Sequence, residues 1–439
     1  MAPAVAPVAA AVSVPDDVWA ALLGDHYDPS TMPSRESRAT AQEVTIPTRD
    51  LREIAASPEP EDREDAQSLA EREGIVQFHL GARPYCVRWS QDGSLLAVGD
   101  EDSRIHVFGE DLADAKHVLN DSVTPADALP TLALCWRPGT AAARARSVLV
   151  EGNCAGIISH WHVPSSKRLH KLSHPGNEIY CIDYAHDAWA FATGGKDAVV
   201  RIYEEATKSV LVSMHGGAER SLRKGHVAQI FSARFHDTDP NMVATGGWDR
   251  VVHIWDARTG ASTGSISGPF VAGDCLDVRG NDLLVGSRGR SNQVQIFDLR
   301  KPSEQATEAF TIWAGEGESE PWTLYACRFS RDAQCGRIGI GAGAPGSGDG
   351  KVVVIDRGTG RVAAEKTFAR KSVYSVDFAP PSADGSMRIA FVAGSRGDSF
   401  AATLDLIAGV TEANTTASGV PHVDSADAVS DQVPATDPM

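Results

Sequence analysis

Apolar and polar residues alternate along short segments through the middle of this chain. In Tyr85–Trp89 and Phe231–Phe235, for example, every second residue is apolar. A period of two is typical of a β-strand that is buried on one side. Glycine and aspartate recur between such segments, where they favour tight turns. The pattern therefore predicts a succession of short strands joined by turns.

These strands recur as one unit about every 40–50 residues, which is the period of propeller blades. Each unit has a first strand that ends in a bulky residue, a second strand that runs into a Gly/Asp turn, and a third strand. The predicted first strands are Tyr85–Trp89, Leu132–Trp136, Tyr180–Tyr184, Phe231–Phe235, Asp274–Val278, Tyr325–Phe329 and Tyr374–Phe378. The predicted third strands end at Phe108, Trp161, Tyr203, Trp255, Phe297, Ile355 and Leu404. Seven such units predict an all-β ring of seven blades.

The way in which the ring closes can also be predicted. Each of the first six units is followed by a short extra strand, such as Leu169–Leu172 or Ser209–Met214, but nothing comparable follows Leu404. The apolar stretch Ile75–Leu80 precedes the first unit and can supply the missing strand. Closure by both chain ends would remove an open sheet edge.

The fourth unit resembles the WD40 repeat, since Gly225-His226 opens it and Trp255-Asp256 closes it. The resemblance covers roughly residues 75–406 and implies a seven-bladed WD40 β-propeller. It also implies a structural hydrogen-bond tetrad, which would consist of His226, Thr245, Asp249 and Trp255. The other units are degenerate: His79 and His174 remain in units one and three, and units five to seven lack this histidine.

Net charge separates the ends of the chain from its middle. The chain has 439 residues and a net charge of −17, and residues 1–77 carry 15 acidic and 6 basic side chains. Residues 405–439 carry 6 acidic side chains and no basic one. We therefore expect an N-terminal extension over 1–74 (largely disordered, with short helices possible), the propeller over 75–406 and a disordered acidic tail over 407–439.

One face of the propeller is predicted to bind partners. Alternation places the residue four positions before each terminal bulky residue on the same strand face, at the rim of the central channel. An aromatic residue holds this position in five units, and the residue before the turn Asp of unit four adds a tryptophan. The predicted rim residues are Tyr85, Tyr180, Phe231, Trp248, Tyr325 and Tyr374, whereas Leu132 and Asp274 occupy the other two units. Exposed Tyr, Trp and Phe are typical anchors of protein interfaces.

A ring of mostly charged residues stands one position before the bulky residues. It consists of Arg88, Cys135, Asp183, Arg234, Asp277, Arg328 and Asp377. Strand alternation directs these side chains to the opposite face, towards a neighbouring blade, so we expect Arg–Asp pairs that fix one blade to the next.

Sequence motifs for catalysis fail on their context. Gly341–Gly346 matches G-x-G-x-x-G but runs into a strand, whereas a dinucleotide site needs a following helix. Gly152–Gly156 imitates a nucleophile elbow, but it corresponds to a blade turn and not to the strand-to-helix turn that an elbow requires. The seven cysteines include no C-x-x-C pair, and His and Cys lack zinc-ligand spacing. We therefore predict no catalytic, cofactor-binding or metal-binding residue, and no enzyme.

Two functions remain open. The first is a scaffold or adaptor that binds other proteins within a multi-protein complex. The second is a substrate receptor of a cullin-RING ubiquitin ligase, since W-D-x-R motifs in such receptors resemble Trp255–Arg258 and, with Phe for Trp, Phe297–Arg300. In this second case Arg258 and Arg300 would contact the ligase adaptor. The acidic surplus, the missing apolar span and the absence of catalytic motifs predict no nucleic acid, membrane or small-molecule partner. The expected location is cytoplasmic, with nucleus, cytoskeleton or cilium open.

Overall fold

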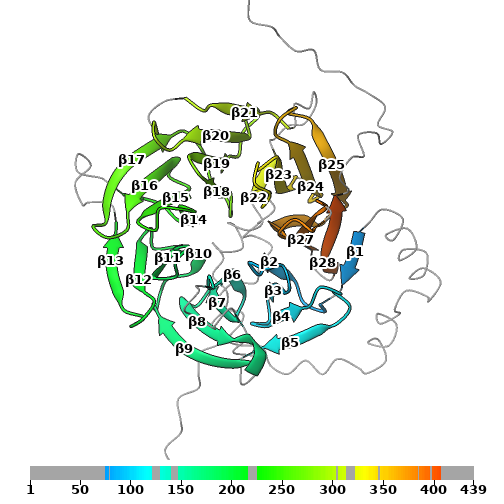
Figure 1. The fold of residues 1–439 in the computed structure, drawn as a ribbon, viewed down its shortest axis with the longest axis horizontal. Coiled ribbons are helices and arrows are strands. Elements are labelled where there is room, and N and C mark those ends of the chain that lie inside the picture. The colour runs from blue at the N-terminus through cyan, green and yellow to red at the C-terminus, as the bar shows by residue number, and fades with distance from the viewer. Residues whose placement is uncertain are drawn as a thin grey trace, which may run out of the picture. The chain divides into compact units, whose positions relative to one another are not determined.

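The computed structural model describes residues 75–78, 80–120, 129–139, 147–215, 225–302, 305–312, 322–344, 347–383, 385–395 and 398–406. These residues form seven four-stranded antiparallel sheets, arranged as the blades of a ring (Figure 1). The predicted seven-bladed β-propeller is therefore confirmed. The predicted extensions over 1–74 and 407–439 lie outside the described residues.

Six of the blades are each built from four strands that are consecutive in the chain, and in every blade the innermost strand is the first of its unit (Figure 1). The innermost strands are β2 (Pro84–Trp89), β6 (Thr131–Trp136), β10 (Ile179–Tyr184), β14 (Ile230–Phe235), β18 (Leu276–Arg279), β22 (Thr323–Phe329) and β26 (Ser372–Phe378). The second strands are β3 (Leu96–Asp100), β7 (Val148–Asn153), β11 (Ala190–Gly195), β15 (Met242–Gly247), β19 (Asp282–Gly286), β23 (Arg337–Gly343) and β27 (Met387–Ser395).

The outer half of each blade follows the same order. The third strands are β4 (Ile105–Phe108), β8 (Ile157–His162), β12 (Val200–Glu204), β16 (Val251–Asp256), β20 (Val294–Asp298), β24 (Gly350–Asp356) and β28 (Asp398–Leu406). The outermost strands are β5 (Ala115–Leu119), β9 (Lys167–Ser173), β13 (Val210–Met214), β17 (Ala261–Ser267), β21 (Glu308–Phe310), β25 (Val362–Phe368) and β1 (Ile75–Phe78). A 3-10 turn, η4 (Val163–Ser165), follows β8.

The ring closes as the sequence predicts. Strand β1 pairs antiparallel with β28, from Ile75 opposite Leu404 to Phe78 opposite Ala401. The first and last described strands lie side by side at this point (Figure 1). The last blade is therefore completed by the first strand of the described chain, which ends at Phe78 and not at Leu80.

Close packing between blades explains the glycines of the second strands. A Cβ atom on Gly152 would lie 2.5 Å from a side-chain carbon of Ile179, and one on Gly194 would lie 2.7 Å from Ile230. In both cases the obstructing residue belongs to the innermost strand of the next blade. Since real Cβ contacts are longer than this, these positions need glycine for the blades to pack.

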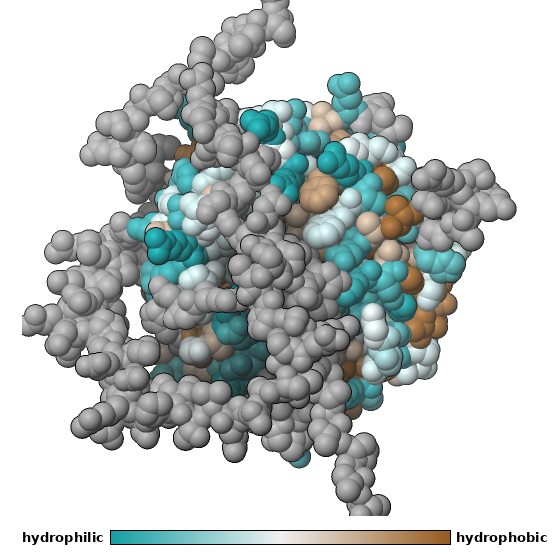
Figure 2. Space-filling model, turned by 180° about the vertical axis from the view of Figure 1, so that it is seen from behind, coloured by the Kyte–Doolittle hydropathy of each residue, from teal (hydrophilic) through white to brown (hydrophobic). Residues whose placement is uncertain are grey.

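The outermost strands carry most of the exposed large apolar residues. They include Val76, Val118, Leu169, Val210, Leu211 and Val362, which are 43–49% exposed. On the side of the molecule opposite to Figure 1, hydrophobic surface gathers along the right-hand margin, where β13 lies (Figure 2). Such residues, spread over several blades, are normal for a protein surface and define no single binding patch.

Candidate functional site

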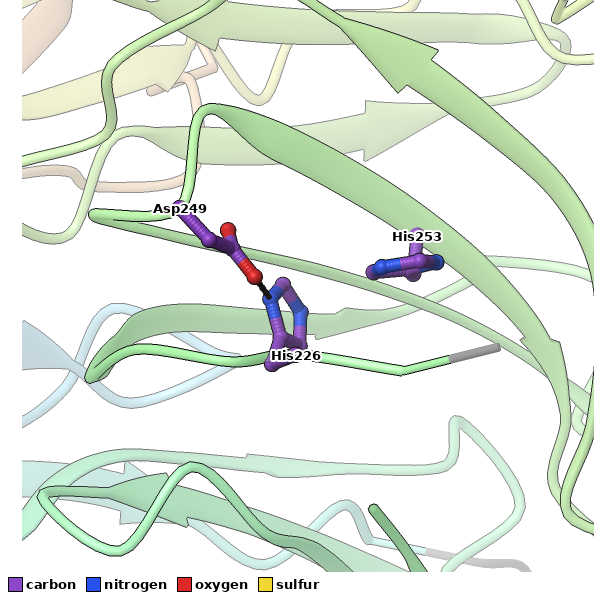
Figure 3. A group of neighbouring side chains, drawn as sticks. All are labelled: His226, Asp249 and His253. Atoms are coloured by element: carbon purple, nitrogen blue, oxygen red, sulfur yellow. Dashed lines mark hydrogen bonds and ion pairs between the residues drawn. The ribbon is translucent and has the colours of Figure 1, made fainter. Parts of the chain in front are cut away.

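The structure brings the four predicted tetrad residues together in blade 4. His226 precedes β14, Thr245 lies in β15, Asp249 lies in the following turn, and Trp255 lies in β16. Nδ1 of His226 is 2.8 Å from Oδ2 of Asp249 (Figure 3). Nε2 of His226 is 2.8 Å from Oγ1 of Thr245. The indole N–H of Trp255 donates to the same Oγ1 at 2.7 Å. A single chain of hydrogen bonds thus joins three segments of the blade.

Asp249 is held as a carboxylate by this network. Burial acts to raise the pKa of Asp249, but hydrogen bonds from His226 and from the amides of Val227 and Val251 outweigh it. The pKa of Asp249 therefore lies below its usual range. The ionised form accepts the His226 proton best, which stabilises the turn.

A second histidine packs against the tetrad without taking part in it. His253 lies in β16, and its ring meets that of His226 edge to face at 4.7 Å between centroids (Figure 3). It is 7% exposed, and its buried Nδ1 has no hydrogen-bond partner. Potential ligand atoms of His226, Asp249 and His253 lie within 4.8 Å of one another, which no other trio of His, Cys, Asp or Glu achieves in the part of the chain that the structure describes.

Blades 2 and 3 hold their third strands in other ways. In blade 2, Trp161 donates its indole N–H to Oε2 of Glu151 at 2.9 Å, and Thr131 donates its hydroxyl to Oε1 at 2.9 Å. Burial raises the pKa of Glu151. In blade 3, the Tyr203 hydroxyl lies 2.6 Å from Nε2 of His174. The sequence did not single out Glu151, because no repeat motif places an acid at this position. His79, the histidine expected in unit one, lies outside the described residues.

The predicted rim residues gather at one mouth of the channel, which we call the aromatic mouth (Tyr85, Tyr180, Phe231, Trp248, Tyr325 and Tyr374). Four of them are buried and so are not the exposed anchors that the sequence suggested, whereas partner binding at this mouth stays a prediction. Tyr85, Phe231, Tyr325 and Tyr374 are only 5–7% exposed. They lie against one another or against the two remaining rings: Tyr374 is 5.8 Å from Tyr85 and 5.5 Å from Tyr325, between centroids.

Two rings of the aromatic mouth remain partly exposed. Tyr180 stacks on Phe231 with centroids 4.7 Å apart, and Trp248 stacks on the other side of the cluster at 5.2 Å from Phe231. Phe270 extends this stack, with its centroid 6.1 Å from that of Trp248. The accessible aromatic surface therefore lies over blades 3 and 4.

A β-bulge explains why the rings turn inward. The pairing of the first two strands shifts register at the start of six of the seven blades, for example between Pro84 and Cys86 and between Ile230 and Ser232. The extra residue in each bulge is the rim residue itself, such as Tyr85 or Phe231. A bulge reverses the side to which the following side chains point. Simple alternation therefore misplaced the rim residues relative to the rest of their strands.

The ring of charged residues also lines the channel, where three arginines converge on one carboxylate. Arg234 donates to both carboxylate oxygens of Asp274, at 2.7 and 2.9 Å, and Arg88 and Arg328 each pair with Asp274 as well. We call these four residues the septum. Asp274 is the acidic residue at a position that is aromatic in five blades, and this departure was the available sign of its role.

The aspartates of the ring link neighbouring blades, but largely through backbone amides. Asp183 accepts the amide of Phe235 at 2.7 Å, Asp277 that of Phe329 at 2.9 Å, and Asp377 that of Trp89 at 2.8 Å. Each donor belongs to the blade after that of its aspartate. The expected Arg–Asp pairs are thus replaced by amide contacts, except for a 3.8 Å approach of Arg234 to Asp183.

The septum separates two hollows on the channel axis. The hollow at the aromatic mouth has a volume of about 60 Å³, and its lining includes Tyr85, Tyr180, Arg88 and Asp274. The other has a volume of about 830 Å³ and is lined by charged residues, among them Arg279. The two mouths therefore offer different chemistry: aromatic on one side, polar on the other.

The two predicted ligase-adaptor arginines share one local geometry. Arg258 and Arg300 follow the third strands of blades 4 and 5, and their side chains are 63% and 68% exposed. Each forms an ion pair with the aspartate two residues before it, at 3.0 Å for Asp256 and 2.6 Å for Asp298. The structure shows both guanidiniums accessible; contact with an adaptor stays a prediction.

The motifs that imitate catalytic sites lie in hairpins. Gly152–Gly156 joins β7 to β8, and the segment that begins at Gly341 joins β23 to β24. Neither runs into a helix, as the sequence analysis predicted. No helix among the described residues has the length and hydropathy needed to cross a bilayer.

Comparisons with known proteins agree with this architecture. Residues 73–108 and 219–256 match the family model "WD domain, G-beta repeat". The WD repeat-containing protein slp1 of Schizosaccharomyces pombe is 27% identical over 191 residues, which cover 41% of this chain and 33% of that protein. The APC/C activator protein CDC20 of Saccharomyces cerevisiae is 25% identical over 183 residues, which cover 41% and 27%. The matched region thus spans a third or less of these relatives.

Two further likenesses extend over most of the chain. The LEC14B protein of Lithospermum erythrorhizon is 23% identical over 357 residues, which cover 72% of each protein. The β-propeller domain of Cps50 (Swd1) from Myceliophteria thermophila has a TM-score of 0.58 at 14% identity, and covers 75% of this chain and 98% of that domain. Seven blades around a closed ring define a β-propeller. The chain is therefore a seven-bladed β-propeller that carries matched WD40 repeats.

Proposed function

We propose that this chain is a non-catalytic scaffold or adaptor of the cell interior, which binds partner proteins at the aromatic mouth. The observation that carries the proposal is the stack in which partly exposed Tyr180 and Trp248 rest on buried Phe231. Rings held in this way lose little conformational freedom on binding, and Tyr and Trp dominate the hot spots of protein interfaces.

The relatives support the same class of function. CDC20 of Saccharomyces cerevisiae is named an activator of APC/C, and a further relative, from Dictyostelium discoideum, is named an anaphase-promoting complex subunit, so both act with other proteins. Propellers expose loops from every blade on a rigid ring, which suits the assembly of several partners. Because the septum lies across the channel, the two mouths and the outer surface remain for such contacts.

The test compares partner capture by the intact chain and by a Tyr180→Ala/Trp248→Ala variant. We expect the variant to melt as the parent does, because both rings are at the mouth and not in a blade core. Loss of two hot spots of about 2 kcal/mol each should weaken binding about a thousandfold. Phe310→Ala, which removes a partly exposed ring from outer strand β21, is the matched control. Equal capture by all three proteins would refute the proposal.

A second candidate is a substrate receptor of a cullin-RING ubiquitin ligase. It is favoured by the repeated Asp-x-Arg geometry, in which Arg258 and Arg300 stand exposed on neighbouring blades. Arg258→Ala with Arg300→Ala should then remove a ligase adaptor from the captured proteins. If this variant loses its partners while the mouth variant keeps them, the receptor replaces the scaffold as the preferred function.

A further inference from the structure

Four aromatic rings and one arginine form a stack along the aromatic mouth, from blade 3 to the entry of blade 5. Successive rings are within 29° of parallel, and their centroids are 4.7, 5.2 and 6.1 Å apart. A guanidinium lies over the last ring, 5.6 Å from its centroid. We call this stack the ladder, and in order it consists of Tyr180, Phe231, Trp248, Phe270 and Arg250.

The accessible part of the ladder is electropositive. Phe231, Trp248 and Phe270 each have two neighbours within the ladder, so what they expose is mainly the edges of their rings. An aromatic ring is negative on its face and positive at its edge. The guanidinium of Arg250 adds a full positive charge at one end. The ladder therefore favours a ligand that carries negative charge.

Arg250 has no counter-ion of its own. Its side chain is exposed, and no carboxylate in the described part of the chain forms an ion pair with it. The adjacent carboxylate of Asp249 is engaged elsewhere, since it is hydrogen-bonded to His226 and to the amide of Val227. An anion from outside the described residues can therefore pair with Arg250 without displacing an existing partner.

The backbone at Arg250 also differs from that of other blades in the residue that it carries. Its φ is +60°, in the left-handed region that glycine adopts most easily. The turn residue at this position in blades 1 to 3 also has a positive φ but is small, namely Ser103, Gly156 and Ala198. A long side chain thus stands in blade 4 in spite of a backbone cost, which favours a role for its charge at the surface.

An exposed apolar residue completes this surface. Val227 is 53% exposed, and its amide donates to Oδ2 of Asp249 at 3.1 Å, which holds it beside the turn of Arg250. We propose that the ladder and Val227 bind an extended acidic segment of a partner protein. Its carboxylates lie at Arg250 and along the ring edges, and an apolar side chain covers Val227. This inference rests on the proposed function and adds the chemistry of the partner.

The charge of the whole chain makes this inference specific to one surface. The chain has a net charge of −17, so long-range electrostatics acts against an acidic partner. Binding of an acidic peptide therefore depends on a local positive surface.

The experiment measures binding of a fluorescein-labelled copolymer of glutamate and tyrosine to the full chain by fluorescence anisotropy. We expect saturable binding that weakens as salt is added, because salt screens exposed charges. Arg250→Glu should weaken binding by about tenfold or more, since an attraction becomes a repulsion. Arg250→Gly should also weaken it and should melt close to the parent, because glycine suits the positive φ of this position. Arg361→Glu is the matched control, at an exposed arginine between β24 and β25, and should bind as the parent does.

Three results would overturn the proposal. The first is the absence of saturable binding, and the second is equal weakening by Arg250→Glu and Arg361→Glu. The third is a dimer in light scattering that Arg250→Glu dissociates, because an acidic segment of a second copy would then be the occupant.

This proposal and the proposed function can fail separately. If Tyr180→Ala/Trp248→Ala loses its partners while Arg250→Glu keeps them, the mouth binds partners without selecting acidic segments, and only the proposed function stands. If the acidic copolymer binds through Arg250 but the Tyr180→Ala/Trp248→Ala variant keeps every partner, the proposed function falls and the acidic-peptide site stands.

Discussion

Blades 4 and 2 solve the same packing problem with different chemistry. Each buries a tryptophan in its third strand, and Trp255 and Trp161 are 2% and 3% exposed. In blade 4 the indole N–H reaches Thr245 and through it a His226–Asp249 pair. In blade 2 a single buried carboxylate, that of Glu151, accepts directly from the indole and from Thr131.

The two blades differ in the direction in which the pKa of the buried carboxylate is shifted. Burial acts to raise the pKa of the blade 4 carboxylate, whose side chain is 3% exposed, but hydrogen bonds from an imidazole and from backbone amides hold this pKa low. The blade 2 carboxylate is fully enclosed, and burial raises its pKa. Burying a charge is costly unless hydrogen bonds compensate for it. We infer that fixing a tryptophan requires an acceptor for its N–H, and that the identity of this acceptor is free to vary between repeats.

The largest expected effect removes the feature that the two blades share. Trp255→Ala and Trp161→Ala should each lower the free energy of unfolding by about 3–5 kcal/mol, the usual cost of truncating a buried tryptophan. Chemical denaturation of each variant measures it. Leu169→Ala, at a residue 49% exposed on β9, is the control and should change stability by less than about 0.5 kcal/mol. A Trp255→Ala variant as stable as the control would contradict the tetrad.

How far the sequence predicts these features depends on whether the repeat motif is preserved. The ring, its closure by Ile75–Phe78 and the blade 4 contacts follow from the strand period and from the complete repeat at 225–258. Glu151 could not be predicted, because its partners are 20 and 10 residues away and only folding brings them together. The septum was predictable only in part: Asp274 stands out as an acid at a position that is aromatic in five blades, but the convergence of Arg88, Arg234 and Arg328 on it arises only on folding.

The second-largest expected effect concerns a residue that blade 4 has and blade 2 lacks. His226→Ala removes one hydrogen-bond partner from the Asp249 carboxylate and from the Thr245 hydroxyl. Loss of the partner of a buried polar group lowers the free energy of unfolding by about 1–3 kcal/mol. Unfolding in urea should show a loss of about 2–3 kcal/mol. The corresponding position in blade 2 has no histidine, so blade 2 offers no equivalent of this variant. A loss below about 0.5 kcal/mol would show that the pair contributes little.

Glu151→Gln should show how ionisation of the buried Glu151 affects the stability of the protein. The amide can accept from Trp161 and donate to Thr131, so the variant keeps both contacts while removing the buried charge. Because burial raises the pKa of Glu151, the folded protein keeps its proton at pH values where the unfolded chain, with a pKa of about 4.3, has lost it. Stability of the parent therefore falls as pH rises through this window.

The variant lacks this titration, so its stability relative to the parent should improve as the pH rises from 4.5 to 8. Denaturant midpoints of both proteins at the two pH values measure the difference. A constant difference would mean that folding does not raise the pKa of Glu151.

The smallest effect concerns His160, a second titrating group of blade 2. Its ring is 1% exposed, and Nε2 lies 3.2 Å from the Tyr184 hydroxyl and 3.7 Å from Glu205. Burial lowers the pKa of His160, although Glu205 acts in the opposite direction. The folded protein therefore keeps the ring neutral where the unfolded chain, with a pKa of about 6.5, takes up a proton. Stability should fall as pH decreases below about 6.5, opposite in sign to the effect of Glu151.

His160→Gln should remove this loss while it preserves a polar partner for Tyr184. Between pH 7.5 and pH 5.5 we expect the parent to lose more stability than the variant, by at most about 1.4 kcal/mol per pH unit for one proton. Titration of Glu205 does not contribute to this difference. Burial acts to raise its pKa, but hydrogen bonds from His160, Lys208 and Tyr184 bring it to about 2, so that it stays ionised over this range. If the parent and His160→Gln lose stability equally, a histidine in another blade carries the acid sensitivity, and the contrast between blades 2 and 4 must then be sought in Glu151 alone.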